Sequence, residues 1–293
     1  MDFKQTGIDL HIHSTASDGT LSPVEILRLA EKLNLGAISI TDHDTLKGSR
    51  QLLEAAGASD VRVLTGVEIS TTPPASYTVA GSFHILGYGI RLKDPALNQT
   101  LETLQHAREN RNPLIIARLN AMGIDISLEE VIQASGEAQI GRPHVAQLMI
   151  KKGFVQTFDE AFDVYLGFNR PAYVDKFRLD CQKAIEMIIK AGGTPVLAHP
   201  FLLQIQDNSR LESLVGVLKE MGLQGIEVYY PEHSSENVEF YSRLALSHDL
   251  AITGGTDFHG AINPDIQLGY GKGDFFVPYT LYDLLLKRQQ TMV

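Results

Sequence analysis

The stretch Ile8-Asp9-Leu10-His11-Ile12-His13 places two histidines at the end of an apolar run that is typical of a buried β-strand. Side chains two residues apart point to the same side of a strand, so His11 and His13 can face one metal ion while Ile12 packs behind them. Imidazole nitrogens suit zinc, iron and manganese. Taken alone, such a pair is more often a partly buried pair of histidines than a metal site.

The same pattern returns along the chain, because further acidic and histidine residues follow apolar, strand-like runs. Taken alone, Asp18-Gly19 fits a turn, and Thr41-Asp42-His43-Asp44 fits a polar loop. The combination favours a metal site, because most of the 10 histidines lie in this set. Active groups of parallel barrels sit at the carboxyl ends of the strands, so we expect one face of a barrel to collect metal ligands. The remaining members are Glu68 in Gly66-Val67-Glu68, His84, His199 in Ala198-His199-Pro200, and Asp257 and His259 in Asp257-Phe258-His259.

The order of predicted elements divides the chain into an α/β part and a helical part. Strand and helix patterns alternate over residues 1–97 and again over 179–293, which favours a parallel sheet or barrel. Between them, residues 98–178 carry helical spacing with no strand signal, and we expect a helical insertion. The predicted helices span residues 23–34, 127–135, 143–152, 158–166, 181–191, 209–221 and 235–248, and a short strand, a candidate antiparallel hairpin partner, spans 82–90.

Composition limits the class of protein. The chain has 293 residues and a formal net charge of −10, which argues against capture of long nucleic acid by a basic surface. It has no apolar stretch long enough to cross a bilayer, and its first residues lack the features of a secretion signal. The single Cys181 forms no internal disulfide, so we expect a cytoplasmic protein with no membrane partner. The sequence leaves the oligomeric state undetermined.

Together, these residues resemble the PHP (polymerase and histidinol phosphatase) family. The resemblance implies a distorted (β/α)7 TIM-like barrel that binds two or three divalent ions, Mn²⁺, Fe²⁺ or Zn²⁺. The residue before Asp257 is Thr256, where Ser is usual in the family; Thr keeps the hydroxyl. Carried over by motif, the first ion takes His11, His13, Glu68 and Asp257, the second Glu68, His84 and His199, and the third Asp18, His43 and His259.

The helical segment, with Ile140-Gly141-Arg142-Pro143-His144, further resembles the branch that includes 3′,5′-nucleoside bisphosphate phosphatases and the exonuclease RNase AM. This resemblance implies a metal-bridging hydroxide, held by Glu68 and Asp257, that attacks the phosphate of a small nucleotide. The leading substrate is the bisphosphate pAp, cleaved to AMP and phosphate. Three alternatives stay open: a 5′-3′ exoribonuclease on short RNA, a histidinol phosphate phosphatase, and a non-catalytic binding module.

Candidate substrate contacts lie around the insertion. An Arg fork matches phosphate oxygens, so Arg142 and His144 in Gly141-Arg142-Pro143-His144 are candidates, with a solvated helix start as the alternative. Lys176 and Arg178 are candidates for binding a second phosphate, with a solvated surface position as the alternative. His233 is equally well explained as a general acid or as a residue of a plain surface turn.

Overall fold

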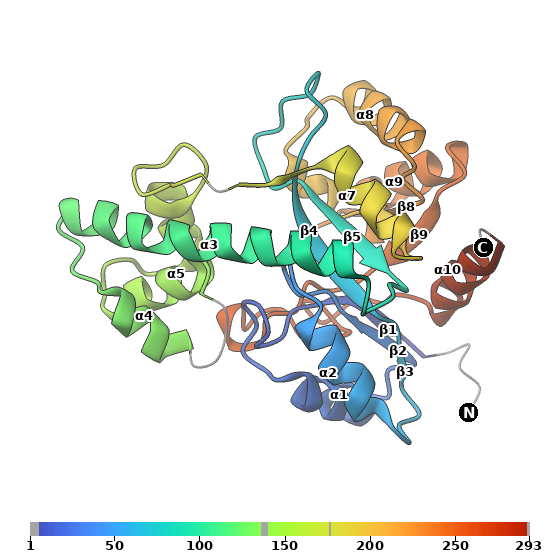
Figure 1. Ribbon diagram of the computed structural model, residues 1–293, viewed down its shortest axis with the longest axis horizontal. Helices are drawn as coiled ribbons and strands as arrows, with labels where there is room; N and C mark the ends of the chain where they lie inside the picture. Colours follow the sequence, from blue (N-terminus) through green and yellow to red (C-terminus); the bar gives the residue numbers. More distant parts are fainter. Residues whose placement is uncertain (1–5, 136–139, 176, 292–293) are drawn as a thin grey trace.

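The computed structural model describes residues 6–135, 140–175 and 177–291, and it has an α/β fold with two sheets (Figure 1). One sheet is three-stranded and parallel, in the order β1-β2-β3, and the other is six-stranded, in the order β6-β4-β5-β7-β8-β9. The strands are β1 (Ile8–Ile12), β2 (Ala37–Ile40), β3 (Arg62–Val63), β4 (Gly66–Thr72), β5 (His84–Tyr88), β6 (Leu179–Asp180), β7 (Thr194–Leu197), β8 (Gly225–Tyr229) and β9 (Ala251–Gly254).

The helices expected over 23–34, 127–135, 143–152, 181–191, 209–221 and 235–248 are confirmed to within two residues at each end. In α1, Ser22 and Glu25 form the reciprocal capping box, with Pro23 in the first turn. The buried face of α1 then packs Ile26 and Ala30 against β1 and β2. The α-helices are α1 (Pro23–Lys32), α2 (Lys47–Ala56), α3 (Pro95–Ala121), α4 (Leu128–Ser135), α5 (Arg142–Lys151), α6 (Phe158–Ala161), α7 (Cys181–Lys190), α8 (Asn208–Glu220), α9 (Ser235–Ser247) and α10 (Tyr279–Thr291). The expected helix over 158–166 is α6 continued by a π-helical turn, η2 (Phe162–Leu166), and short 3-10 turns η3 (Pro200–Leu203) and η4 (Gly260–Ile262) follow β7 and β9.

The six-stranded sheet contains one reversed strand. The expected hairpin partner over 82–90 is confirmed as β5, which pairs antiparallel with both β4 and β7, whereas β7, β8 and β9 run parallel. Because β5 runs against its neighbours, its first residue, His84, lies at the edge where the parallel strands end. The reversal therefore brings His84 to the same edge as His199, which follows β7.

A single closed sheet is not found among the described residues. Instead, two isolated parallel bridges link the sheets, Ile12 to Phe258 and His43 to Glu68. One expectation is corrected here: Glu68 was expected just after the end of a strand, the one formed by the apolar run over 61–64. That strand is the short β3, and Glu68 lies inside β4, where the bridge from His43 reaches it.

The helix α3 connects two hydrophobic cores. Its first half contributes Leu97 and Leu101 to the core around β4, β5 and α7, and its second half contributes Ile115 and Leu119 to a separate core with α4 and α5. In Figure 1, α3 runs from the sheets to the end of the molecule where α4 and α5 lie. The expected boundary between residues 97 and 98 falls inside this continuous helix.

Within the described ranges, no helix is both long and apolar enough to span a membrane.

Candidate metal centre

The expected ligands converge on the buried carboxylate of Glu68. Its Oε1 lies 2.7 Å from Nδ1 of His84 and 2.9 Å from Nε2 of His199. Its Oε2 lies 2.9 Å from Nδ1 of His43, 3.2 Å from Nε2 of His13 and 3.5 Å from Nε2 of His11. These histidines come from the ends of β1, β2, β5 and β7, so the fold brings together residues that are far apart in the sequence.

Two aspartates close the cluster on the side of β9. Oδ1 of Asp257 lies 3.0 Å from Nε2 of His13 and 3.3 Å from Nε2 of His11. Oδ1 of Asp18 lies 3.5 Å from Nε2 of His259 and 3.5 Å from Nδ1 of His13. The structure therefore gathers every ligand position expected from the sequence into one continuous cluster.

The backbone of this cluster is strained. The φ angle is 25° at His199, 55° at Asp257 and 57° at Asp44, a left-handed region that residues with side chains rarely adopt. Such outliers persist where the surrounding structure enforces them, and they gather at functional sites.

Close packing next to Asp257 explains the glycine pair before it. A Cβ on Gly255 would lie 2.2 Å from the backbone nitrogen of His11, and one on Gly254 would lie 2.5 Å from Cβ of Tyr229. A side chain at Gly255 would therefore push the loop that carries Asp257 away from β1, and one at Gly254 would push the end of β9 away from β8.

The cluster fits divalent cations because many of its buried polar atoms lack a hydrogen bond. A buried polar group without a partner is costly, and a bound cation would satisfy several of these atoms at once. Three groupings of ligand atoms also lie within 4.8 Å of one another: His13, Asp18, His43 and His259; His11, His13 and Glu68; and His43, Glu68 and His84. The unpaired atoms are Nε2 of His11 and His13, Nδ1 of His43 and His199, Oδ1 of Asp18 and Asp257, and Oε2 of Glu68.

Electrostatics keeps the carboxylates ionised. Burial alone would raise the pKa of Glu68, but His84, His43 and His11 hold it well below its usual range. Burial lowers the pKa of His13, but the nearby carboxylates of Asp257 and Glu68 outweigh it and raise that pKa to about 10. The carboxylates therefore give the site negative charge. In the absence of cations, protons on the histidines balance part of that charge.

Residues behind the cluster fix the orientation of its imidazoles. Glu227, fully buried in β8, accepts a hydrogen bond from Nδ1 of His11 at 2.9 Å and another from the backbone nitrogen of His199 at 2.7 Å. A carboxylate only accepts, so Nδ1 of His11 carries the proton and Nε2 is free for a metal. Asp42 orients His13 through Ser17. The hydroxyl of Ser17 donates a hydrogen bond to Asp42 at 2.5 Å, and its oxygen lies 3.4 Å from Nδ1 of His13.

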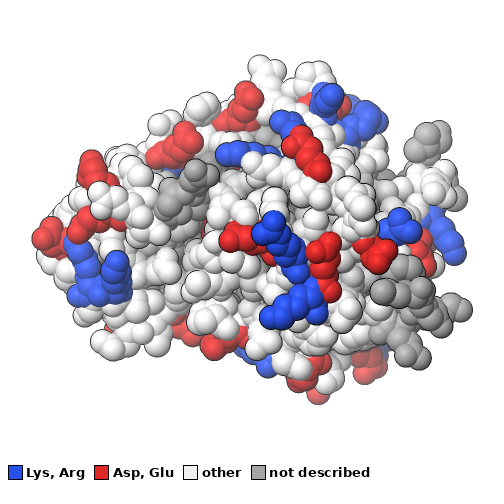
Figure 2. Space-filling model, turned by 90° about the horizontal axis from the view of Figure 1, so that it is seen from below, with Lys and Arg blue, Asp and Glu red and all other residues white. Residues whose placement is uncertain are grey.

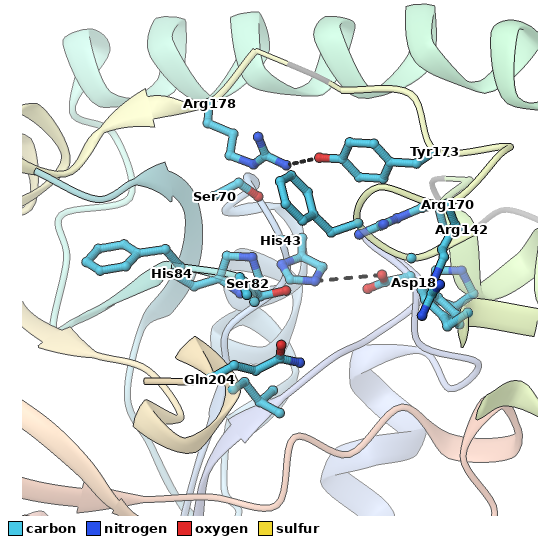
Figure 3. A pocket seen from close by; sticks show the side chains of 18 of the residues that line it. Asp18, His43, Ser70, Ser82, His84, Arg142, Arg170, Tyr173, Arg178 and Gln204 are labelled. Atoms are coloured by element: carbon cyan, nitrogen blue, oxygen red, sulfur yellow. Dashed lines mark hydrogen bonds and ion pairs between the residues drawn. The ribbon is translucent and has the colours of Figure 1, made fainter. Parts of the chain in front are cut away.

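A cavity of about 480 Å³ separates the cluster from the helical segment. Asp18, His43 and His84 line one wall (Figure 3). The arginine wall of the same cavity consists of Arg108, Arg111, Arg142, Arg170 and Arg178. It meets the acidic cluster where Nη1 of Arg108 lies 3.9 Å from Oδ2 of Asp18. The cavity therefore combines side chains that suit cations with side chains that suit anions.

Among the expected substrate contacts, Arg142 and Arg178 line this cavity. Arg142 donates to the carbonyl of Leu166 at 2.8 Å and lies 5.5 Å from the ring centres of Phe162 and Tyr173. Arg178 donates to the hydroxyl of Tyr173 at 2.7 Å. Both guanidinium groups are thus held in place before any ligand binds.

The other expected contacts have different surroundings. His144 is buried, and its Nδ1 accepts a hydrogen bond from the backbone nitrogen of Gly141 at 3.1 Å, which makes it a helix cap. The residue Lys176 lies outside the described residues. His233 donates from Nδ1 to the carbonyl of Val228 at 2.7 Å, and burial lowers its pKa to about 4. At neutral pH its Nε2 is therefore an acceptor, which does not suit a general acid.

Sequence reasoning missed Arg108, Arg111 and Arg170. The first two continue the helical spacing of Leu101, Leu104 and Ile115, so a charged pair on the buried face of α3 was the signal that could have revealed them. Arg108 donates to Asp44 at 3.1 Å. Burial, with the like charges of Arg108 and Arg142, lowers the pKa of Arg111 to about 9. Crowded cations of this kind favour an anionic ligand.

Comparison with known proteins adds the family. The PHP domain model matches residues 9–262. The chain is 32% identical over 253 residues to a 3′,5′-nucleoside bisphosphate phosphatase of Chromobacterium violaceum, covering 86% of this chain and 87% of that protein. It is 31% identical over 251 residues to a 5′-3′ exoribonuclease of Haemophilus influenzae, covering 86% and 89%. A solved structure of a proposed metal-dependent phosphoesterase of Bifidobacterium adolescentis matches with a TM-score of 0.83 at 27% identity, covering 97% and 96%.

The family match spans both α/β parts and the helical segment between them. It includes every residue of the His, Asp and Glu cluster that is able to bind metal. The chain belongs to the PHP domain family, and it is an enzyme, a metal-dependent phosphoesterase.

Proposed function

We propose that the enzyme removes the 3′-phosphate of a 3′,5′-nucleoside bisphosphate, with pAp as substrate and AMP and phosphate as products. The single observation that carries this proposal is the cavity lined by both candidate metal ligands and arginines. Its metal-binding wall receives the phosphate that is cleaved, and its arginine wall receives a second phosphate on the same molecule. The relative from Chromobacterium violaceum, named for this substrate class, supports the choice.

In this proposal, the clustered side chains hold up to three divalent ions. The contacts of Glu68 with imidazoles on both of its oxygens support its role as a ligand shared between two ions. The first ion is held by His11, His13, Glu68 and Asp257, the second by Glu68, His84 and His199, and the third by Asp18, His43 and His259.

Each part of the chain then has a stated task. Bound divalent ions supply a nucleophile at neutral pH and neutralise the phosphoryl oxygens. Glu227 keeps Nε2 of His11 free for ligation by holding the proton on Nδ1. Arg142 and Arg178 bind the phosphate that stays on the product, and Arg111 adds charge at the same wall. His233 is assigned no proton transfer.

The same proposal gives the architecture a functional reading. The two sheets act as one distorted barrel, joined where His43 meets Glu68 and Ile12 meets Phe258. Residues 98–178 act as a cap over its mouth, which is supported by a cavity lined from both parts of the chain.

The test is hydrolysis of pAp by the manganese-loaded enzyme, with free phosphate and the nucleotide product both measured. We expect AMP rather than the 3′-monophosphate, and no turnover in Glu68→Gln. Histidinol phosphate serves as the competing monoester. Turnover of histidinol phosphate with none of pAp would refute the bisphosphate assignment while leaving the metal centre intact.

A second candidate is cleavage of short 5′-phosphorylated RNA, because a terminal phosphate would suit the same arginine wall. The relative from Haemophilus influenzae supports it. On the face shown in Figure 2, acidic and basic side chains are interspersed and no continuous basic field is seen, which favours short over long RNA. A 5′-phosphorylated trinucleotide, compared with pAp at equal concentration, ranks the two candidates.

A further inference from the structure

The side chain of Phe168 lies in the cavity wall although it is apolar and 53% exposed. Its neighbours in that wall include Arg170 and Tyr173, which come from the same loop. A half-exposed phenyl ring among arginines adds little to the packing of the protein itself. Such a ring is the kind of surface on which a planar, partly apolar ligand stacks.

The loop that carries Phe168 is ordered by its own hydrogen bonds. The backbone nitrogen of Gly167 donates to the carbonyl of Phe162 at 2.8 Å, and that of Arg170 donates to the carbonyl of Gly167 at 3.1 Å. A Cβ on Gly167 would lie 2.5 Å from the carbonyl oxygen of Phe162, so only glycine fits this turn. The ring is therefore presented by a preformed loop, which lowers the entropic cost of binding.

The neighbouring rings leave Phe168 available. Tyr173 meets it at a ring-centre distance of 5.4 Å and an interplanar angle of 79°. In such an edge-to-face pair, at least one face of Phe168 stays uncovered by Tyr173. Phe162 and Tyr173 already carry the guanidinium of Arg142, so they contribute to the anion-binding part of the wall.

We propose that Phe168 is the stacking platform for the nucleobase of the substrate, and that this contact selects nucleotides over other phosphate esters. A ligand that combines an anion with an aromatic plane fits best, because the arginines and the phenyl ring line the same cavity. This inference rests on the proposed nucleotide substrate, and it adds the determinant that separates a nucleotide from a sugar phosphate of equal charge.

The first test uses fluorescence, because the chain contains no tryptophan. In Phe168→Trp the new indole is the sole tryptophan, and stacking of adenine on it quenches the emission. We expect AMP to quench Phe168→Trp in the manganese-loaded enzyme, and ribose 5-phosphate, which lacks the base, to leave it unchanged. The matched control is Phe276→Trp, at a side chain that is 50% exposed and outside the cavity lining. Equal effects of AMP on both variants, or of both ligands on Phe168→Trp, would overturn the inference.

The second test removes the ring. Phe168→Ala should weaken AMP binding by about 5-fold or more, the factor expected for one base stacked on an aromatic side chain. Ribose 5-phosphate should bind equally to both proteins, since it makes no contact with the ring. Unchanged AMP affinity in Phe168→Ala contradicts the platform. Failure of the wild-type enzyme to hydrolyse pAp, with quenching of Phe168→Trp intact, would instead refute the proposed reaction and leave the platform standing.

Discussion

Replacing Arg111 by Met should make the free enzyme more stable and its substrate binding weaker. Arg111 is 5% exposed, and its Nε makes no hydrogen bond. Its pKa is lowered to about 9, first by burial and then by the charges of Arg108 and Arg142. In the absence of a bound anion, this guanidinium is buried beside other cations. Met has a similar length and no charge, so it removes the repulsion and keeps most of the packing.

The size of both effects follows from known replacements. Exchanging a buried ion pair for apolar residues of similar volume is often neutral or stabilises a protein by about 1 to 4 kcal/mol, and we expect a gain of this order for a buried guanidinium beside like charges. For a chain of this size that corresponds to a rise in Tm of about 2 to 8 °C. Loss of a charge-assisted contact with phosphate should weaken binding by about 10- to 100-fold.

The assay is thermal unfolding of the metal-free proteins, combined with pAp titration of the metal-loaded ones. Arg28→Met, at an exposed position of α1, is the control, and its Tm should not change. A fall in the Tm of Arg111→Met would mean that the charge is already satisfied without a ligand. An unchanged affinity for pAp would remove Arg111 from the anion site.

Three further predictions concern the metal centre. Glu227→Gln should lower metal affinity about 10- to 100-fold, because it weakens the hold on His11 and on the backbone of His199; metal titration checks this. Gly255→Ala should lose bound manganese, because its Cβ would lie 2.2 Å from the nitrogen of His11; a variant with full metal content would contradict the packing argument. The raised pKa of His13, about 10, stabilises the metal-free protein below pH about 6.5, and this stabilisation is lost as the pH rises toward 10. Manganese binding should therefore release protons and tighten as the pH rises, and a weakly buffered titration that detects no release would show that the cluster is already deprotonated.

The metal-binding half of the site was predictable because its chemistry is local in the sequence. Each of His13, His43 and His199 follows a buried apolar run, and strand ends meet at one edge in a parallel arrangement. The strand over 82–90 was also readable as a hairpin partner. The position of Glu68 inside β4 could not be predicted, because the short β3 and the longer β4 form one apolar pattern in the sequence.

The proposed anion-binding half was harder to predict because it depends on tertiary contacts. Arg108 resembles any solvated helix residue until α3 is placed against Asp44. His144 looked like a phosphate ligand, but its ring is used to cap α5. Phe168 gave no periodic signal, since it belongs to a loop whose exposure is set by the packing around it. Burial of arginines and exposure of an aromatic ring become visible only in three dimensions.

The central claim is that one buried carboxylate, Glu68, gathers histidines to bind several divalent ions together. Metal analysis of manganese-reconstituted protein, wild type beside Glu68→Gln, tests it most directly. The account predicts more than one ion per wild-type chain and a loss of at least one in the variant. A wild-type chain that retains no manganese, or a variant with an unchanged metal content, would contradict it.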